Sequence, residues 1–497
     1  MERLDLPEEL WVSIFDIATY DEHFRDHTVP TAWSESSWFR TLFNEWSLRS
    51  PLEKLVDDQK KNYATKKAIV STCKRWRQIG SEYLFKYVFL ENGSRLRQLC
   101  ALMDQESTVG KFTKRFHLVR YHPERVSIQN MENAVVSIIR HCPNLEVFAI
   151  TWPIDVSFGP IADALCTFCS HSIRSVQWTI PFEALPRLIW ALESLPNLSS
   201  LYIQFGQPVS EVVHLGAAAN ITLSLPNLSQ LSLANFFEDF LDQATGWDLP
   251  VLRNLSLDFG NSRENLPDVM DFLSEHGSQL TYLDLNFIPV LDVPTILELC
   301  PALKTFSFNP DWRLPIAQTA LPTNPFVRRP HLNITHIGCH KLLYAFGVGF
   351  ASTYGSVDPL RTHIIRRTND MNFAALNKTN FPSLKYIRVL SRGLLSDLER
   401  ANGPDQRCTE RWERWWKQCA VQGIRLEDCT GDLLGTLPQI EGEGDGDDDG
   451  TETELSDAPT DVMSMVSAGP FPELRRLVNE CRRMTAGKKP RPFSEYQ

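Results

Sequence analysis

LPNLSSLYI, residues 195–203, returns almost unchanged as LPNLSQLSL at residues 225–233. Both stretches space their apolar residues as L-x-x-L-x-L, the period-two pattern of a strand with one buried face. Five further segments share this form, and consecutive first anchors lie 23 to 30 residues apart. A regular period of this length indicates stacked units of one kind. The seven segments are CPNLEVFAI (142–150), HSIRSVQWTI (171–180), LPNLSSLYI (195–203), LPNLSQLSL (225–233), LPVLRNLSL (249–257), SQLTYLDLN (278–286) and CPALKTFSF (300–308).

The pattern and its period resemble leucine-rich repeats. A helical stretch precedes most of the strands, as at 131–140 and 266–276, and FPSLKYIRVL (381–390) adds one more copy. HLNITHIGC (331–339) matches only weakly. One unit cannot bury its own strand face, because each buried Leu or Phe contributes only about 1.5 to 3 kcal/mol against the entropy of ordering the chain. We therefore expect an α/β fold over residues 91–430, a solenoid with a parallel sheet and helices on its convex side.

The repeats depart from the usual leucine-rich pattern after the third anchor. Gly206, Phe236, Gly260 and Ile288 stand where an asparagine is expected. The asparagine ladder of the family is therefore absent there, which predicts an irregular array.

The end of the array is rich in tryptophan. The stretch RCTERWERWWKQCAVQGIRLED (407–428) predicts an amphipathic helix followed by a last strand. A terminal cap is the favoured interpretation, because the end of a solenoid needs a cover. A partner groove formed by Trp412, Trp415 and Trp416 is the alternative.

The amino-terminal stretch LPEELWVSIFDIA (6–18) predicts a helix with two apolar stripes. Leu10, Ile14 and Ile17 form one stripe, and Trp11, Phe15 and Ala18 form the other. Each apolar stripe needs a surface that buries it, so the helix is expected to contact two different surfaces. KKAIVSTCKRWRQIGSEYLFKYVFL (66–90) adds further helical spacing and leads into the repeats.

These two stretches resemble the F-box, a three-helix module that opens with Leu-Pro-x-Glu-Leu and an Ile-Phe pair and later carries Val-Cys-Lys-x-Trp. Thr72 replaces the valine, and an insert at 21–65 separates the two halves of the module, 1–90. Within the insert, SESSWFRTLFNEW (34–46) predicts a helix packed on the module. The resemblance implies docking on a Skp-type adaptor, and through it on a cullin. The implied adaptor-binding residues are Leu6, Pro7, Leu10, Ile14, Phe15, Cys73 and Trp76.

Substrate recognition would then fall to the repeat array. In L-x-x-L-x-L the anchors point inward, and the alternate residues form an exposed ladder on the other face. Tyr202 and Tyr282 are the favoured contacts, because aromatic anchors dominate interface energetics. The candidate substrate-binding residues are Tyr202, Gln204, Gln230, Asn254, Asp258, Tyr282, Asp284 and Asn286.

The net charge of −11 arises mainly from one segment, since ten acidic residues lie between Glu441 and Asp461. We expect 435–469 to be a disordered acidic linker and 470–497 a basic helix or tail. Arg475, Arg476, Lys488 and Lys489 lie at roughly bipartite nuclear-signal spacing, and a solvated basic helix is the alternative. The remaining chain carries no field that would attract nucleic acid or an anionic membrane.

The chain begins without an apolar secretory core and contains no run of about 18 apolar residues, so we expect a cytoplasmic or nuclear protein that binds no membrane. Its eleven cysteines are odd in number and irregularly spaced, which favours reduced thiols. Catalytic motifs such as G-x-S-x-G and H-E-x-x-H are absent from the sequence. Two groups have some metal-ligand character, but ordinary packing is favoured for both, and no cofactor is expected. They are Cys166, Cys169 and His171, and His331, His336, Cys339 and His340.

The combined resemblance to F-box and leucine-rich-repeat proteins implies a non-catalytic protein, the substrate-recognition subunit of a Skp/cullin/F-box ubiquitin ligase, with an unidentified protein substrate. The rival prediction is a repeat scaffold whose F-box-like segment only caps the solenoid. Adaptor binding separates the two.

Overall fold

The structure is a computed structural model, and it describes residues 6–20, 24–41, 43, 45–119, 128–154, 158–208, 214–260, 267–286, 292–311 and 326–438. The chain divides into two units, Met1–Leu434 and Gly435–Gln497. Nearly all of the second unit lies outside the described residues, and so do the predicted acidic linker from residue 439 onward and the predicted basic tail.

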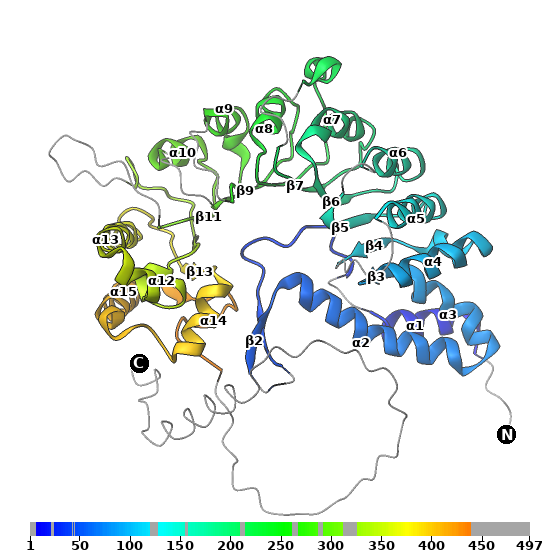
Figure 1. The fold of residues 1–497 in the computed structure, drawn as a ribbon, viewed down its shortest axis with the longest axis horizontal. Helices are drawn as coiled ribbons and strands as arrows, with labels where there is room; N and C mark the ends of the chain where they lie inside the picture. The colour runs from blue at the N-terminus through cyan, green and yellow to red at the C-terminus, as the bar shows by residue number, and fades with distance from the viewer. Residues whose placement is uncertain are drawn as a thin grey trace, which may run out of the picture. The chain divides into compact units, whose positions relative to one another are not determined.

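The first unit is built on a 12-stranded sheet, which confirms the expected α/β class. Every pairing in this sheet is parallel, and the strands follow one another in chain order (Figure 1). The strands are β3 (Tyr87–Leu90), β4 (Arg115–Leu118), β5 (Val147–Pro153), β6 (Ser175–Ile180), β7 (Ser200–Phe205), β8 (Gln230–Ala234), β9 (Asn254–Asp258), β10 (Tyr282–Asn286), β11 (Thr305–Phe308), β12 (His336–Cys339), β13 (Tyr386–Val389) and β14 (Arg425–Glu427).

Helices connect most of these strands and lie along one side of the sheet in Figure 1. Parallel neighbours require such crossovers, because a tight turn cannot return the chain to the same end of the sheet. The helices after β3 are α4 (Gly93–Gln105), α5 (Ile128–His141), α6 (Phe158–Phe168), α7 (Leu185–Glu193), α8 (Glu238–Thr245), α9 (Pro267–His276), α10 (Val293–Leu299), α11 (Leu343–Phe346), α12 (Phe350–Val357), α13 (Pro359–Ala375), α14 (Arg392–Ala401) and α15 (Thr409–Val421).

The apolar anchors of the repeated segments build the core on the helix-covered side. The seven first anchors are all at most 1% exposed. They are Leu145, Ile173, Leu198, Leu228, Leu252, Leu280 and Leu303.

A proline-containing turn feeds several of the strands. In the segment before β8, the backbone N–H of Leu228 donates to the carbonyl of Leu225 at 3.1 Å, with Pro226 at the second position of the turn. Proline is preorganised for this position, because its ring fixes φ near −65°. The same bond recurs before β5, β7, β9, β11 and β13.

Asparagines in these turns link one unit to the one before it. The Asn227 side-chain amide donates to the carbonyl of Pro196 at 3.1 Å, and Asn197 donates in the same way to His171 at 2.9 Å. Asn144 and Asn333 repeat the contact with Lys111 and Pro301. The missing family asparagines are thus matched by a polar ladder at a different position in the unit.

The tryptophan-rich segment covers the last strands. Trp415 stacks on Phe373 with ring centroids 4.1 Å apart, and Trp412 packs edge-on against Phe346. Trp412 and Trp415 are buried, and Trp416 is partly buried and donates its indole N–H to the Leu434 carbonyl at 3.2 Å. This packing agrees with the cap interpretation, because two of the three rings are buried against the last units and the third is partly buried.

In the described part of the chain, three α-helices precede β3. They are α1 (Glu8–Ala18), α2 (Pro51–Thr72) and α3 (Lys74–Lys86). A capping box between Ser50 and Glu53 starts α2, and α3 continues directly into β3. The Gln59 side chain on α2 donates to the Tyr87 carbonyl at 2.7 Å, so the helices contact the edge strand of the sheet.

The prediction of a helix at 34–46 is wrong. The chain forms an antiparallel hairpin there, β1 (Ser37–Arg40) and β2 (Trp46–Arg49). Arg40 lies opposite Trp46 and places its guanidinium 4.9 Å from the indole centroid, and Arg49 lies 4.1 Å from the Phe39 ring. These cross-strand contacts stabilise the hairpin. The same aromatic residues also have helical spacing, but the contacts between the strands outweigh that local preference for a helix.

Candidate partner-binding surfaces

Helix α1 follows from a proline start and an acidic first turn. Pro7 is the N-cap residue, and the backbone N–H of Leu10 donates to its carbonyl at 3.2 Å. Glu8 and Glu9 in the first turn complement the positive end of the helix dipole. This helix carries the two stripes seen in the sequence.

One stripe of α1 packs against the chain through Phe15 and Trp11, while its third residue, Ala18, is exposed. Phe15 is 1% exposed and belongs to a small core with Ile69, Ile79 and Tyr83. The Trp76 ring lies 5.1 Å from Phe15, and it also packs against Trp11. The Tyr83 hydroxyl donates to the Val12 carbonyl at 3.0 Å, and burial, with Asp16 and Glu82 nearby, raises the pKa of Tyr83 to about 12.

The other stripe is exposed within the described chain. Leu10 is 49% exposed, Ile14 43% and Ile17 78%. We call these three residues the α1 outer stripe. Side chains at i, i+4 and i+7 lie on one helix face, so they form a single apolar surface that none of the described residues covers.

The predicted adaptor-binding residues therefore divide into two groups. Phe15 cannot contact a partner, because it is sealed in the core, and its assignment to the contact surface is a correction made by the fold. Cys73 caps α3 by accepting the backbone N–H of Trp76 at 3.4 Å, and it remains exposed. Leu6 is half-buried and Pro7 is exposed beside the outer stripe.

The opposite face of the sheet is partly covered by residues 24–36, which we call the inner segment. Figure 1 shows this segment running inside the curve of the sheet before it reaches β2. It begins at Phe24, whose ring packs against Tyr87 and Phe89 with centroids 5.1 and 5.7 Å away. It ends where the backbone N–H of Ser36 donates to the Cys429 carbonyl at 2.9 Å. It thus crosses from β3 to the end of β14.

Side chains of the sheet hold the inner segment by its backbone. Gln230 accepts the Val29 N–H at 2.9 Å and donates to the Val29 carbonyl at 2.8 Å. Arg115 donates to the Asp26 carbonyl. The Gln230 side chain thus satisfies both the N–H and the carbonyl of Val29, as a neighbouring strand would do. Val29 therefore needs no strand partner.

Further contacts with the sheet hold the inner segment near its two ends. His27 pairs with Glu146 at 2.9 Å, near β5. At the other end Trp33 donates its indole N–H to Ser307 at 2.9 Å, and Arg388 lies 4.7 Å above its ring. Arg388 also donates to the Trp33 carbonyl at 3.0 Å.

The predicted exposed ladder is wrong at three positions. Gln230 is 1% exposed beneath Val29, and Tyr282 is 9% exposed against Thr31 and Ala32, where burial raises its pKa well above the usual value. Asp284 is 7% exposed because His340 pairs with it at 2.6 Å. The other five candidates keep accessible surface, and they are Tyr202, Gln204, Asn254, Asp258 and Asn286.

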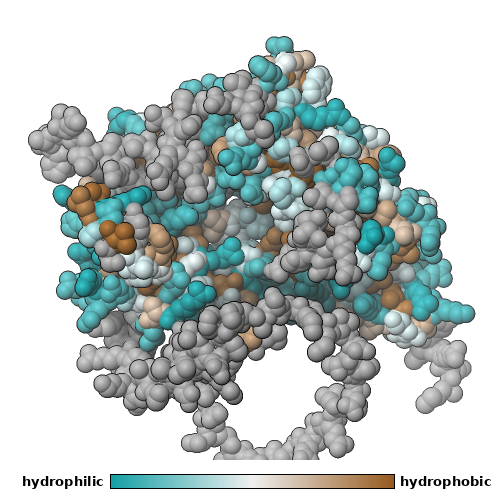
Figure 2. All heavy atoms as spheres, viewed as in Figure 1, coloured by the Kyte–Doolittle hydropathy of each residue, from teal (hydrophilic) through white to brown (hydrophobic). Residues whose placement is uncertain are grey.

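A second apolar surface was not predicted. Figure 2 shows hydrophobic residues gathered over α12 and α13, where Phe350, Val357 and Leu360 are 63 to 76% exposed. The sequence signal that could have indicated this surface is the set of apolar residues at 350–360, which lack the L-x-x-L-x-L pattern of the buried strands.

The metal-ligand candidates do not converge. Among the described residues, no group of three His, Cys, Asp or Glu side chains could hold an ion. Cys169 donates to the Cys142 carbonyl at 3.3 Å, and burial raises the pKa of its thiol to about 12. The His331 ring donates to the Cys300 carbonyl at 3.1 Å, whereas the His336 ring stacks on Tyr386.

No helix in the described part of the chain is both long and apolar enough to cross a bilayer. Comparisons with protein-family models and with curated proteins find no match to this chain.

Proposed function

We propose that this protein is the substrate receptor of a Skp/cullin/F-box type ubiquitin ligase, with an F-box-like module at 1–90 and a leucine-rich-repeat solenoid at 91–430. The module docks on the Skp-type adaptor, and the repeat array binds the substrate. The protein itself catalyses nothing in this proposal. It raises the local concentration of the substrate near the conjugating enzyme.

The α1 outer stripe is the observation that carries this proposal. One face of α1 already packs on Trp76 and Tyr83, so the helix is held in place while Leu10, Ile14 and Ile17 face solvent. Leaving three large apolar side chains on one exposed face is unfavourable unless a partner covers it, since each full burial contributes about 1.5 to 3 kcal/mol.

Substrate contact falls on the ladder residues that the inner segment leaves accessible. Three of these residues lie at or next to the carboxyl-terminal ends of their strands, namely Gln204 in β7, Asp258 in β9 and Asn286 in β10. The inner segment, in contrast, mostly contacts the first residues of the strands of the sheet. The carboxyl-terminal half of this face is therefore the proposed contact region, and Tyr202, near the middle of β7, borders it.

The test is co-purification of the full chain with a Skp-type adaptor. Ile14→Asp combined with Ile17→Asp places two charges in the interface, and we expect the affinity to fall at least roughly 100-fold. Leu360→Asp is the matched control, because Leu360 is 71% exposed on the second apolar surface. Adaptor binding that survives the double substitution, or is absent from the unmodified chain, contradicts the proposal.

A repeat scaffold that never enters a ligase is the second candidate. It is favoured by the contact of α2 with β3, because these helices cover the edge strand of the sheet, which would otherwise present unpaired backbone groups. In that case the unmodified chain recovers no adaptor.

A further inference from the structure

A hollow of about 260 Å³ lies where the inner segment starts, beside the first residues of β3, β4 and β5. Its charged lining comes from the segment and from the sheet, and four of its side chains are cationic against one carboxylate. The charged side chains are Arg25, Lys86, Lys114, Arg115 and Glu146, and the other lining residues are Phe24, His27, Tyr87 and Val147.

Arg115 forms the floor of the charge cluster. It is 4% exposed, and its guanidinium donates to the Asp26 carbonyl and, at 3.4 Å, to the His117 ring. Its Nε has no hydrogen-bond partner, and no carboxylate in the described chain forms an ion pair with it. Burial lowers the pKa of Arg115 to about 10, so it still carries its charge at neutral pH.

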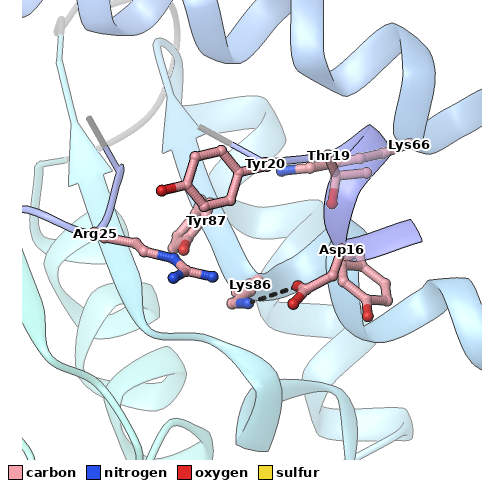
Figure 3. A pocket seen from close by; sticks show the side chains of 8 residues that line it. Asp16, Thr19, Tyr20, Arg25, Lys66, Lys86 and Tyr87 are labelled. Atoms are coloured by element: carbon pink, nitrogen blue, oxygen red, sulfur yellow. Dashed lines mark ion pairs between the residues drawn. The ribbon is translucent and has the colours of Figure 1, made fainter. Parts of the chain in front are cut away.

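Arg25 and Lys86 stand at the open side. Figure 3 shows the adjoining pocket, where Arg25 extends from the inner segment towards Lys86 and Tyr87. Arg25 packs over the Tyr20 ring at 4.8 Å and forms no ion pair with a described residue. Lys86 reaches Asp16 only at 3.9 Å, and the Lys66 ammonium lies 5.1 Å from the centre of the Tyr87 ring.

The acidic groups nearby are already engaged. Glu146 accepts from Lys114 at 2.7 Å and pairs with His27 at 2.9 Å, and these two contacts outweigh burial and lower its pKa to about 2. Asp26 accepts from the backbone N–H and the hydroxyl of Thr28, both at 2.8 Å. Asp26 and Glu146 thus act on Arg115 only through space, and Lys86 has only the long contact with Asp16. Among the described lining residues of the hollow the cations outnumber the carboxylates, and neither Arg25 nor Arg115 forms an ion pair with a described carboxylate.

We propose that this hollow binds a phosphate group, held by Arg25, Lys86 and Arg115. A buried guanidinium that lacks a carboxylate is stabilised by an oxyanion, and guanidinium forks match the oxygens of phosphate. The group comes either from free phosphate or from a phosphorylated side chain. This site does not depend on adaptor binding.

Titration calorimetry of the full chain with inorganic phosphate and with O-phosphoserine tests the site, with chloride added to equal ionic strength. We expect saturable binding of both probes, and Arg25→Gln with Lys86→Gln should weaken it by roughly tenfold or more. Both of these positions are at least partly exposed, so the double variant should fold. Tighter binding of O-phosphoserine identifies a phosphorylated side chain as the source, whereas equal binding identifies free phosphate.

Arg97→Gln is the matched control, since Arg97 is exposed on α4, away from the hollow. Hydrogen exchange gives a second readout, because a phosphate held by Arg25 should slow exchange in residues 24–36. Absence of saturable binding, or equal binding by the double variant and the unmodified chain, overturns the proposal.

Discussion

The α1 outer stripe and the inner face of the sheet arise from equally regular patterns, yet the stripe is open and the sheet face is partly covered. Leu10, Ile14 and Ile17 keep 43 to 78% of their surface, while Gln230 on the sheet keeps 1%. The cover of the sheet comes from residues 24–36, about 200 positions before Gln230 in the chain. A periodic pattern shows which residues share a face, but not which distant segment lies on that face.

The largest expected effect on stability distinguishes the packed stripe of α1 from the α1 outer stripe. Phe15→Ala removes a ring that is 1% exposed, and we expect a loss of about 3 to 5 kcal/mol in the stability of the helical module. Ile17→Ala, at 78% exposure, should change it by less than about 0.5 kcal/mol. Hydrogen exchange of the amides in α1 and α3 measures both. Equal effects would mean that the two stripes do not differ in burial.

The next effect concerns the covered face. Gln230→Leu removes both hydrogen bonds to Val29, which leaves the buried Val29 carbonyl without a partner and its N–H with only the 3.2 Å bond to the Ser200 hydroxyl, at a cost of about 2 to 3 kcal/mol to segment docking. Limited proteolysis between residues 24 and 36 should become roughly 30 to 100 times faster. Gln204→Ala is the control, because Gln204 lies at the uncovered end of β7. Unchanged cleavage of Gln230→Leu would show that the segment is held by other contacts.

A smaller effect depends on pH. The two contacts with His27 and Lys114 hold the pKa of Glu146 at about 2, below its ordinary 4.5. A carboxylate with a lowered pKa stabilises the folded state above pH 4.5, and this contribution is lost as the pH falls towards 2. We expect about 1 to 2 kcal/mol after solvent screening, because a quarter of the side chain is exposed.

Proteolysis of the inner segment across this pH range, using an acid-tolerant protease, measures the loss. Glu146→Gln should flatten the pH dependence between 4.5 and 2 relative to the unmodified chain. A variant profile that keeps the same slope would place the titrating group elsewhere.

Much of the sheet could be predicted because its determinants are local. The anchors Leu198 and Leu228 are buried as their spacing requires, and Pro226 sets the turn before β8. The asparagine ladder of the turns was not predicted. Asn197 and Asn227 follow the prolines of the two LPNL sequences, but each contact joins two units and depends on how they stack. The hairpin at 37–49 was missed because its aromatic residues fit a helical period as well as they fit the contacts of Arg40 and Arg49.

The sequence by itself determined the repeating strand, the buried anchors and the two stripes of α1, because each follows from side-chain periodicity within one element. Only the tertiary structure decided that Phe15 is sealed, that the inner segment lies across the sheet, and that Arg25 meets Lys86 and Arg115 around one hollow. These outcomes depend on contacts between residues tens to hundreds of positions apart. No local pattern encodes such contacts, since they depend on how the whole chain buries its apolar surface and satisfies its polar groups.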